Sequence, residues 1–344
     1  MKFRAFAAAL LLTLLQQPAR ADFTTLAVLG DSLSDNGRLA EATAAATFGL
    51  FSVPSAPYFP GRFSNGPVWV DYYAAAHPDV TVVDFAMGGA FSGVLNGRDN
   101  AGDDELGAVP FFGSSLQTAV SGLNTQLPQV PNVSGSGTSF VLWIGANDIN
   151  SALDIGFANP RDVVPTSLSN VGNAIGTLLA LGANDVYVGN LPDLGRTPDG
   201  IASGRAADLS AATIDFNNGL LALVGGAGAK VHLVDMFTPF NFLLAHAGDF
   251  GYTDTTTSCV DGLLDSTACA NPQDHLFWDN IHPTTGVHAV MAQVFTNSFA
   301  AAPVPLPGGA LLMAPLSAWL VTRRRARHAG RAAALSPPAP GEKC

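Results

Sequence analysis

The sequence predicts an α/β fold around a mainly five-stranded parallel sheet, and two observations lead to that prediction. Five short apolar runs, several rich in β-branched residues, alternate with longer stretches of helical spacing. The runs lie close to Gly, Asn or Asp at their ends, as expected for strands that helices cover on both faces. Such alternation favours right-handed crossovers and places a site at the carboxyl ends of the strands. The predicted strands span residues 24–29, 80–85, 139–144, 185–189 and 230–235.

Three helices are predicted among and after the last strands, over residues 162–181, 206–224 and 283–299. Gly182 suits the C-terminal cap of the first helix, and Pro283 suits the first turn of the last one. Two stretches do not fit this rhythm because they are rich in Gly, Pro, Ser and Asn. We expect these stretches, residues 41–65 and 93–136, to be long loops near the carboxyl edge that shape a substrate site.

Charge is distributed unevenly along the 344 residues, whose formal net charge is −11. Both ends are basic, so residues 22–322 hold only seven Lys and Arg against 26 Asp and Glu. An acidic body repels phosphate backbones, which argues against nucleic acid as a partner.

The N-terminus has the pattern of a secretory signal peptide over residues 1–21. Lys2 and Arg4 form a basic start, residues 6–15 are apolar, and residues 19–21 form a small-x-small cleavage site. An ordinary buried N-terminal helix is the alternative. The order of charge, apolar run and cleavage site favours export.

The C-terminus forms a separate module after a predicted catalytic domain of residues 22–302. A Pro-rich spacer opens residues 303–327, followed by an apolar stretch and an arginine cluster. With its flanks, the apolar part approaches the roughly 20 residues that a bilayer requires, and the arginines mark the cytoplasmic side. A tail helix docked on the domain is the alternative, although the segment has no polar face. Residues 328–344 are expected to be a flexible tail.

Three cysteines are present. Cys259 and Cys269 lie in one loop and are the plausible disulfide pair in an oxidising compartment, with two free thiols as the alternative. Cys344 is left over at the end of the tail, and no Cys/His cluster has zinc-ligand spacing.

Polar residues follow three of the predicted strands. Gly30-Asp31-Ser32 follows the first strand, Gly88-Gly89 the second and Gly145-Ala146-Asn147-Asp148 the third. A serine just beyond a strand, at the start of a helix, would be exposed and its N–H could bind an oxyanion. Each motif alone also fits a turn or a helix cap.

Asp279 and His282 lie three residues apart, just before the last predicted helix. This spacing lets the carboxylate reach Nδ1 of the imidazole and leaves Nε2 for Ser32. A loop hydrogen bond or metal ligation are the alternatives, but His275 and His288 are poor third ligands.

Together these blocks resemble the GDSL, or SGNH, hydrolases over residues 24–300. The blocks are GDS at Ser32, Gly89, GAND at Asn147 and DNIHP at Asp279 and His282, in the family's order. The phrase GRFSNGPVW at residues 61–69 is similar to one in the secreted branch of phospholipase/lecithinase-like bacterial esterases and plant GDSL lipases. The resemblance implies a flavodoxin-like three-layer α/β/α sandwich, the SGNH hydrolase fold.

The resemblance also implies roles. Ser32 would be the nucleophile, His282 its base, and Asp279 the group that orients the base. The N–H groups of Ser32 and Gly89 and the amide of Asn147 would form the oxyanion hole. Many relatives have Asn where this chain has Asp84, which leaves the choice between Gly88 and Gly89 open. We further expect support from Asp31 and Asp148, and no metal or organic cofactor.

The tail resembles the PEP-CTERM sorting signal of Gram-negative bacteria, with Val304-Pro305-Leu306-Pro307 as a variant of its motif. This resemblance implies processing by an exosortase and a destination at the cell surface or in the matrix.

The expected activity is hydrolysis of lipid or acylated-glycan esters. A deacetylase of exported polysaccharide and a non-catalytic surface protein are the rival hypotheses.

Overall fold

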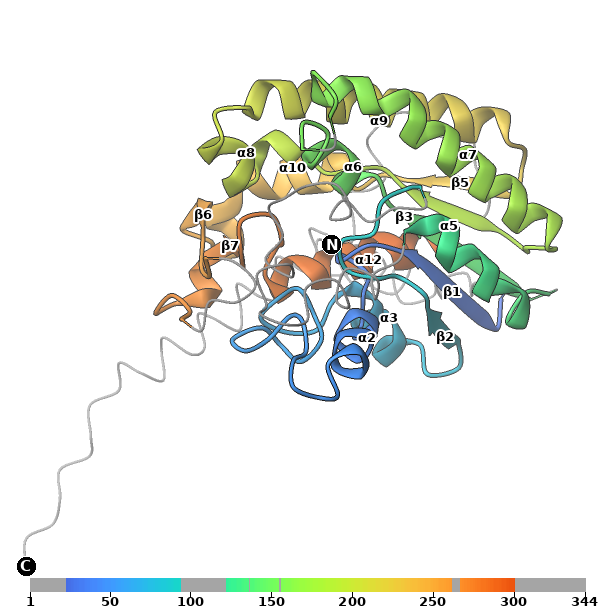
Figure 1. Cartoon of the computed structure of the whole chain (residues 1–344), viewed down its shortest axis with the longest axis horizontal. Helices are drawn as coiled ribbons and strands as arrows, with labels where there is room; N and C mark the ends of the chain where they lie inside the picture. Colours follow the sequence, from blue (N-terminus) through green and yellow to red (C-terminus); the bar gives the residue numbers. More distant parts are fainter. Residues whose placement is uncertain (1–22, 94–121, 136, 155, 262–266, 301–344) are drawn as a thin grey trace, which may run out of the picture.

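A five-stranded sheet, in the order β2-β1-β3-β4-β5, forms the centre of the molecule (Figure 1). This computed structural model describes residues 23–93, 122–135, 137–154, 156–261 and 267–300. All strand pairs of the sheet are parallel. The five predicted strands are confirmed to within one residue at each end. They are β1 (Thr25–Gly30), β2 (Thr81–Asp84), β3 (Thr138–Trp143), β4 (Val186–Gly189) and β5 (Val231–Val234).

Helices cover both faces of the sheet, which gives three layers. Helices α7 (Val164–Ala180) and α9 (Ala206–Gly226) lie on one face, and α3 (Trp69–Ala76) and α12 (Thr285–Ala300) lie on the other (Figure 1). Phe295 of α12 stacks on Trp69 of α3, with ring centroids 3.9 Å apart, and meets the edge of Trp143 in β3. These buried aromatic rings fix the last helix against the sheet.

Shorter elements connect the layers and build the rim. A second, two-stranded parallel sheet pairs β6 (Asp254–Ser258) with β7 (His275–Phe277). The remaining α-helices are α2 (Arg38–Ala46), α5 (Leu123–Gln126), α6 (Ala146–Asn150), α8 (Pro198–Ala202), α10 (Phe237–Ala245) and α11 (Ala247–Phe250). The 3-10 helices are η1 (Leu127–Asn132), η2 (Pro160–Val163), η3 (Leu194–Arg196) and η4 (Pro272–Asp274).

Three expectations need correction. Pro283 is not in the first turn of the last helix, because it forms a bridge with Phe277 and the helix begins at Thr285. The predicted loop 41–65 begins as helix, since α2 continues to Ala46. The predicted loop 93–136 contains α5 and η1, and its residues 94–121 lie outside the described part.

The predicted signal peptide, residues 1–21, and the C-terminal segments 303–327 and 328–344 lie outside the described residues. Within the residues that are described, no helix combines the length and apolar character needed to cross a membrane.

Candidate active site

Ser32 lies in a tight turn directly after β1. The N–H groups of Ser34 and Asp35 both donate to the Asp31 carbonyl at 3.0 Å, which closes the turn around Ser32. The turn starts at Gly30, where a Cβ would come within 2.5 Å of the Trp143 carbonyl oxygen, so only glycine fits without a shift. Two expectations are wrong here. No helix starts at Ser32, and its side chain is largely buried at 5 % exposure.

Three side chains from both ends of the domain form a continuous hydrogen-bonded chain. The Ser32 Oγ lies 2.7 Å from His282 Nε2, and His282 Nδ1 lies 2.6 Å from Asp279 Oδ2. All three residues are buried. With Nδ1–H donating to the carboxylate, Nε2 is the nitrogen that can accept the serine hydroxyl proton. The structure therefore brings the three residues together in the arrangement that proton transfer from Ser32 requires.

The Asp279 carboxylate is held in its charged form by four hydrogen bonds. Its Oδ1 accepts the N–H groups of Ile281 and His282, while Oδ2 accepts His282 Nδ1–H and the Tyr58 hydroxyl at 2.7 Å. Burial alone would raise the pKa of Asp279, but the charge and hydrogen bonds of His282 and the backbone donors lower it. An ionised carboxylate at this position stabilises a protonated His282.

The two glycines after β2 have different environments. The Gly88 N–H donates to Asp35 Oδ2 at 2.8 Å, and a Cβ at Gly88 would meet the Phe63 ring at 2.3 Å. Gly89 has a positive φ of 78°, and none of the described residues accepts its N–H. The Gly88 N–H is thus engaged in holding the loop, whereas the Gly89 N–H has no acceptor among the described residues.

Asn147 and Asp148 connect this glycine loop to the start of α6. The Asn147 Nδ2 donates to the Ala90 carbonyl at 2.9 Å, which uses one of its two N–H groups and leaves the other for a ligand. The buried Asp148 accepts both the N–H and the hydroxyl of Ser92. Asp148 therefore fixes the position of Asn147 relative to Gly89.

Two further carboxyl groups, those of the buried Asp31 and the half-buried Asp84, lie beside the turn. The Asp31 carboxyl accepts the Leu33 N–H, and burial raises its pKa from 3.8 to about 7, against the lowering effects of that hydrogen bond and of the His282 charge. The Asp84 carboxyl accepts the N–H groups of Asn36 and Ala86. Burial and the neighbouring Asp35 raise the pKa of Asp84 well above its usual value. Asp84 thus joins the turn after β1 to the loop after β2.

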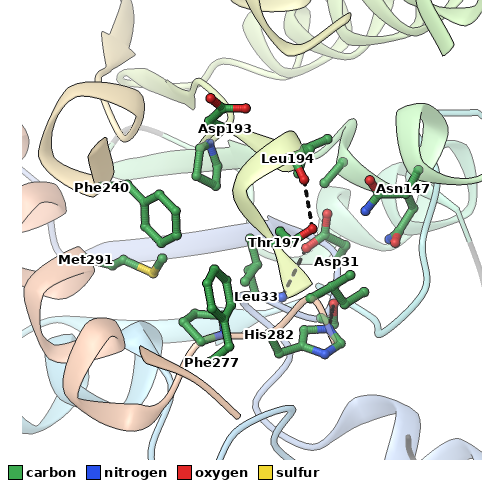
Figure 2. Close-up of a pocket in the computed structure, with 16 residues that line it drawn as sticks. Asp31, Leu33, Asn147, Asp193, Leu194, Thr197, Phe240, Phe277, His282 and Met291 are labelled. Carbon is green, nitrogen blue, oxygen red and sulfur yellow. Dashed lines mark hydrogen bonds between the residues drawn. The ribbon is translucent and has the colours of Figure 1, made fainter. Parts of the chain in front are cut away.

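The site opens into a pocket of about 490 Å³, including space open to solvent. Figure 2 shows Asn147 and Asp31 toward one end of it, and Phe240 and Met291 at the opposite end. Apart from Ser32, His282 and a few other polar residues, the pocket is lined by apolar side chains. Its main apolar members are Leu33, Leu194, Phe240, Phe277, Ile281 and Met291.

Sequence reasoning missed several residues of the site. Tyr58 donates a hydrogen bond to Asp279 and lies in residues 41–65, which were expected to shape the site. No sequence motif in that stretch pointed to Tyr58. Gln126 is fully buried and bonds both the N–H and the carbonyl of Gly30 through its side-chain amide. The segment of Leu194 and Thr197 lines the pocket after β4. This segment follows the carboxyl end of β4, and that position could have indicated from the sequence that it borders the site.

The described residues contain one disulfide, between Cys259 and Cys269, the pair expected from the sequence. Among these residues, no group of His, Cys, Asp and Glu could hold a metal ion.

His288 is fully buried, and burial and the His282 charge lower its pKa to about 3, so it is neutral.

The buried Asp31 predicts a pH-dependent stability. Between about pH 4 and pH 7 the folded chain keeps a proton on Asp31 that the unfolded chain releases, so the free energy of unfolding falls as pH rises through this window. We expect Asp31→Asn to remove this loss and to be more stable than wild type above pH 7, by on the order of 4 kcal/mol at most. Urea unfolding at pH 4 and pH 8 measures the effect. The exposed Asp208→Asn is the control, and equal pH dependence in wild type and Asp31→Asn would contradict the assignment.

Comparison with known proteins gives distant relatives that cover most of the chain. The chain is 26 % identical over 332 residues to a phosphatidylcholine-sterol acyltransferase of Aeromonas hydrophila, covering 82 % of this chain and 92 % of that protein. It is 26 % identical over 288 residues to the thermolabile hemolysin of Vibrio parahaemolyticus, covering 78 % of this chain and 62 % of that protein. Among solved structures, the acetylxylan esterase Axe2 of Geobacillus stearothermophilus aligns with 85 % of this chain and 100 % of its own, at 15 % identity and a TM-score of 0.45.

The family model of GDSL-like lipases and acylhydrolases matches residues 26–295, a range that contains Ser32, Asp279 and His282. The chain therefore belongs to the GDSL-like lipase/acylhydrolase family.

Proposed function

We propose that this protein is an exported serine hydrolase that cleaves carboxylic esters through an acyl-serine intermediate. The observation that carries the proposal is the continuous hydrogen-bonded chain from Ser32 through His282 to Asp279, at the floor of a largely apolar pocket. In this proposal the three residues are nucleophile, general base and orienting carboxylate. Membership of the family agrees with this chemistry.

The proposed reaction proceeds in two halves. Ser32 Oγ attacks the acyl carbon while its proton moves to His282 Nε2, and the resulting tetrahedral intermediate expels the alkoxide, which takes that proton from Nε2. A water molecule then attacks the acyl-serine. His282 removes a proton from this water and returns it to Ser32 as the free acid leaves. No step requires a metal or an organic cofactor.

The negative oxygen of the tetrahedral intermediate needs donors held in place before the reaction. We assign this role to the N–H groups of Ser32 and Gly89 and to the second N–H of Asn147. The loops that carry these donors are tied together by Asp35 and Asp148. Such preorganised donors cost no rearrangement as charge develops.

The pocket lining favours an acyl group larger than acetyl. Six large apolar side chains face the pocket beside Ser32, and burying hydrocarbon against them contributes binding energy that an acetyl group could not provide. Relatives named for phosphatidylcholine and for GDSL esterase/lipase activity agree with a lipid-like ester. We therefore favour lipid esters over acetylated polysaccharide as substrates.

We further propose export through residues 1–21 and sorting of residues 303–327 by an exosortase-type enzyme at the surface of a Gram-negative bacterium. The sequence patterns of both ends support this proposal. Mass spectrometry of the protein from the cell envelope and the medium should find a mature N-terminus near Asp22. Recovery of the protein only in the cytoplasm, with Met1 retained, would rule out export.

Replacing Ser32 by Ala should abolish turnover of p-nitrophenyl esters and labelling by a fluorophosphonate probe, because Ser32 supplies the hydroxyl that lies against His282 Nε2. Stopped assays and gel fluorescence measure the two effects. The matched control is Ser203→Ala, which changes an exposed serine outside the pocket. This variant should retain both ester turnover and probe labelling. Full activity in Ser32→Ala would show that the nucleophile is another residue.

Asn147→Ala should lower kcat by about 10²–10³-fold, because one oxyanion donor is lost. Steady-state kinetics on a p-nitrophenyl ester measure kcat and KM separately. A large rise in KM with an unchanged kcat would contradict the assignment, since it would mean that Asn147 binds the substrate rather than the transition state.

A further inference from the structure

The pocket at Ser32 ends at a wall formed by Phe240 and Met291, and a second cavity lies behind it. Both residues line the catalytic pocket and also line a separate space of about 240 Å³, a volume that includes space open to solvent. They come from different elements, α10 and α12, so the wall stands where these two helices meet. The two cavities are thus neighbours that share only this pair of side chains.

The second cavity is apolar throughout. No polar side chain is among the residues that line it, and its lining is buried in the main hydrophobic core. Hydrocarbon that enters this space would be removed from water against apolar side chains, which is favourable. Besides the wall itself, the lining residues are Met236, Pro239, Leu243, Val287, Val290 and Val294.

The geometry of the first pocket directs an acyl chain toward this wall. Asn147 and Asp31 lie toward the opposite end of the pocket from Phe240 and Met291 (Figure 2). The Phe240 ring meets Phe277 edge to face, with centroids 6.1 Å apart and an angle of 68°. Since Phe277 also lines the catalytic pocket, the aromatic pair makes a continuous apolar surface that ends at Met291.

We propose that Phe240 and Met291 set the length of acyl chain that the enzyme accepts, and that the cavity behind them is a subsite for the distal carbons of longer chains. The inference rests on the proposed ester hydrolysis. An acyl group on Ser32 fills the first pocket until its end reaches the wall. Carbons beyond that point gain no burial unless the wall is removed, after which they enter the second cavity.

A chain-length series tests the wall. On p-nitrophenyl esters from acetate to palmitate, kcat/KM of the wild type should rise by about three- to fourfold per methylene and then level off, because each buried methylene adds a constant increment of binding. Phe240→Ala and Met291→Ala should move this plateau to chains about two carbons longer, with a gain of about tenfold on the long esters. Phe240→Trp should move it to shorter chains.

Phe242→Ala is the matched control, because it makes the same change on the same helix. Phe242 packs on His246 and Phe250 and lines neither cavity. Thermal unfolding of each variant checks that the fold is retained, and Phe240→Leu offers a milder change should the alanine variant unfold.

Two outcomes would overturn the proposal in different ways. If the profiles of Phe240→Ala, Phe240→Leu and Met291→Ala match that of Phe242→Ala, the wall does not select chain length, although ester hydrolysis stands. If wild-type protein hydrolyses no ester of the series and takes up no fluorophosphonate, the proposed function fails and the subsite fails with it.

Discussion

The 2.7 Å hydrogen bond between Ser32 and His282 joins residues 250 positions apart, so the active site exists only when the whole domain has folded. Ser32 is placed by the end of β1, an inner strand between β2 and β3. His282 is placed by the segment that precedes α12, and α12 is held by the stacking of Phe295 on Trp69 and by its edge-to-face contact with Trp143. No local interaction could bring the hydroxyl and the imidazole together. These aromatic contacts therefore help to place His282 beside Ser32.

Buried carboxylates hold the loops at the edge of the sheet. Asp35, Asp84 and Asp148 each accept backbone N–H groups from a neighbouring loop, which ties the segments after β1, β2 and β3 to one another. Burial raises the pKa of all three carboxyls. Asp279 differs, because the charge of His282 and the hydrogen bonds from the His282 ring and from the N–H groups of Ile281 and His282 lower its pKa. Of these four carboxyls, the one with a lowered pKa is thus the one hydrogen-bonded to the His282 ring.

Much of this arrangement could be predicted from the sequence, because parallel strands produce buried apolar runs and their carboxyl ends meet at one edge. The features that depend on tertiary contacts could not be predicted from the sequence. The burial of Ser32 and the bridge at Pro283 follow from packing between distant segments, and neither leaves a local pattern. The choice between Gly88 and Gly89 required knowing that Asp35 accepts one N–H. Tyr58 carries no motif.

The disulfide between Cys259 and Cys269 has a practical consequence for handling the protein. The N–H groups of Cys259 and Val260 both donate to the carbonyl of Trp278, which directly precedes Asp279. The loop closed by the disulfide therefore helps to hold the segment that carries Asp279 and His282. Closing a loop of ten residues contributes roughly 2–3 kcal/mol of stability. Thiol reductants in a purification buffer, or production in a reducing cytosol, would withdraw that support next to His282. Recombinant work should therefore use an oxidising host compartment and reductant-free assays.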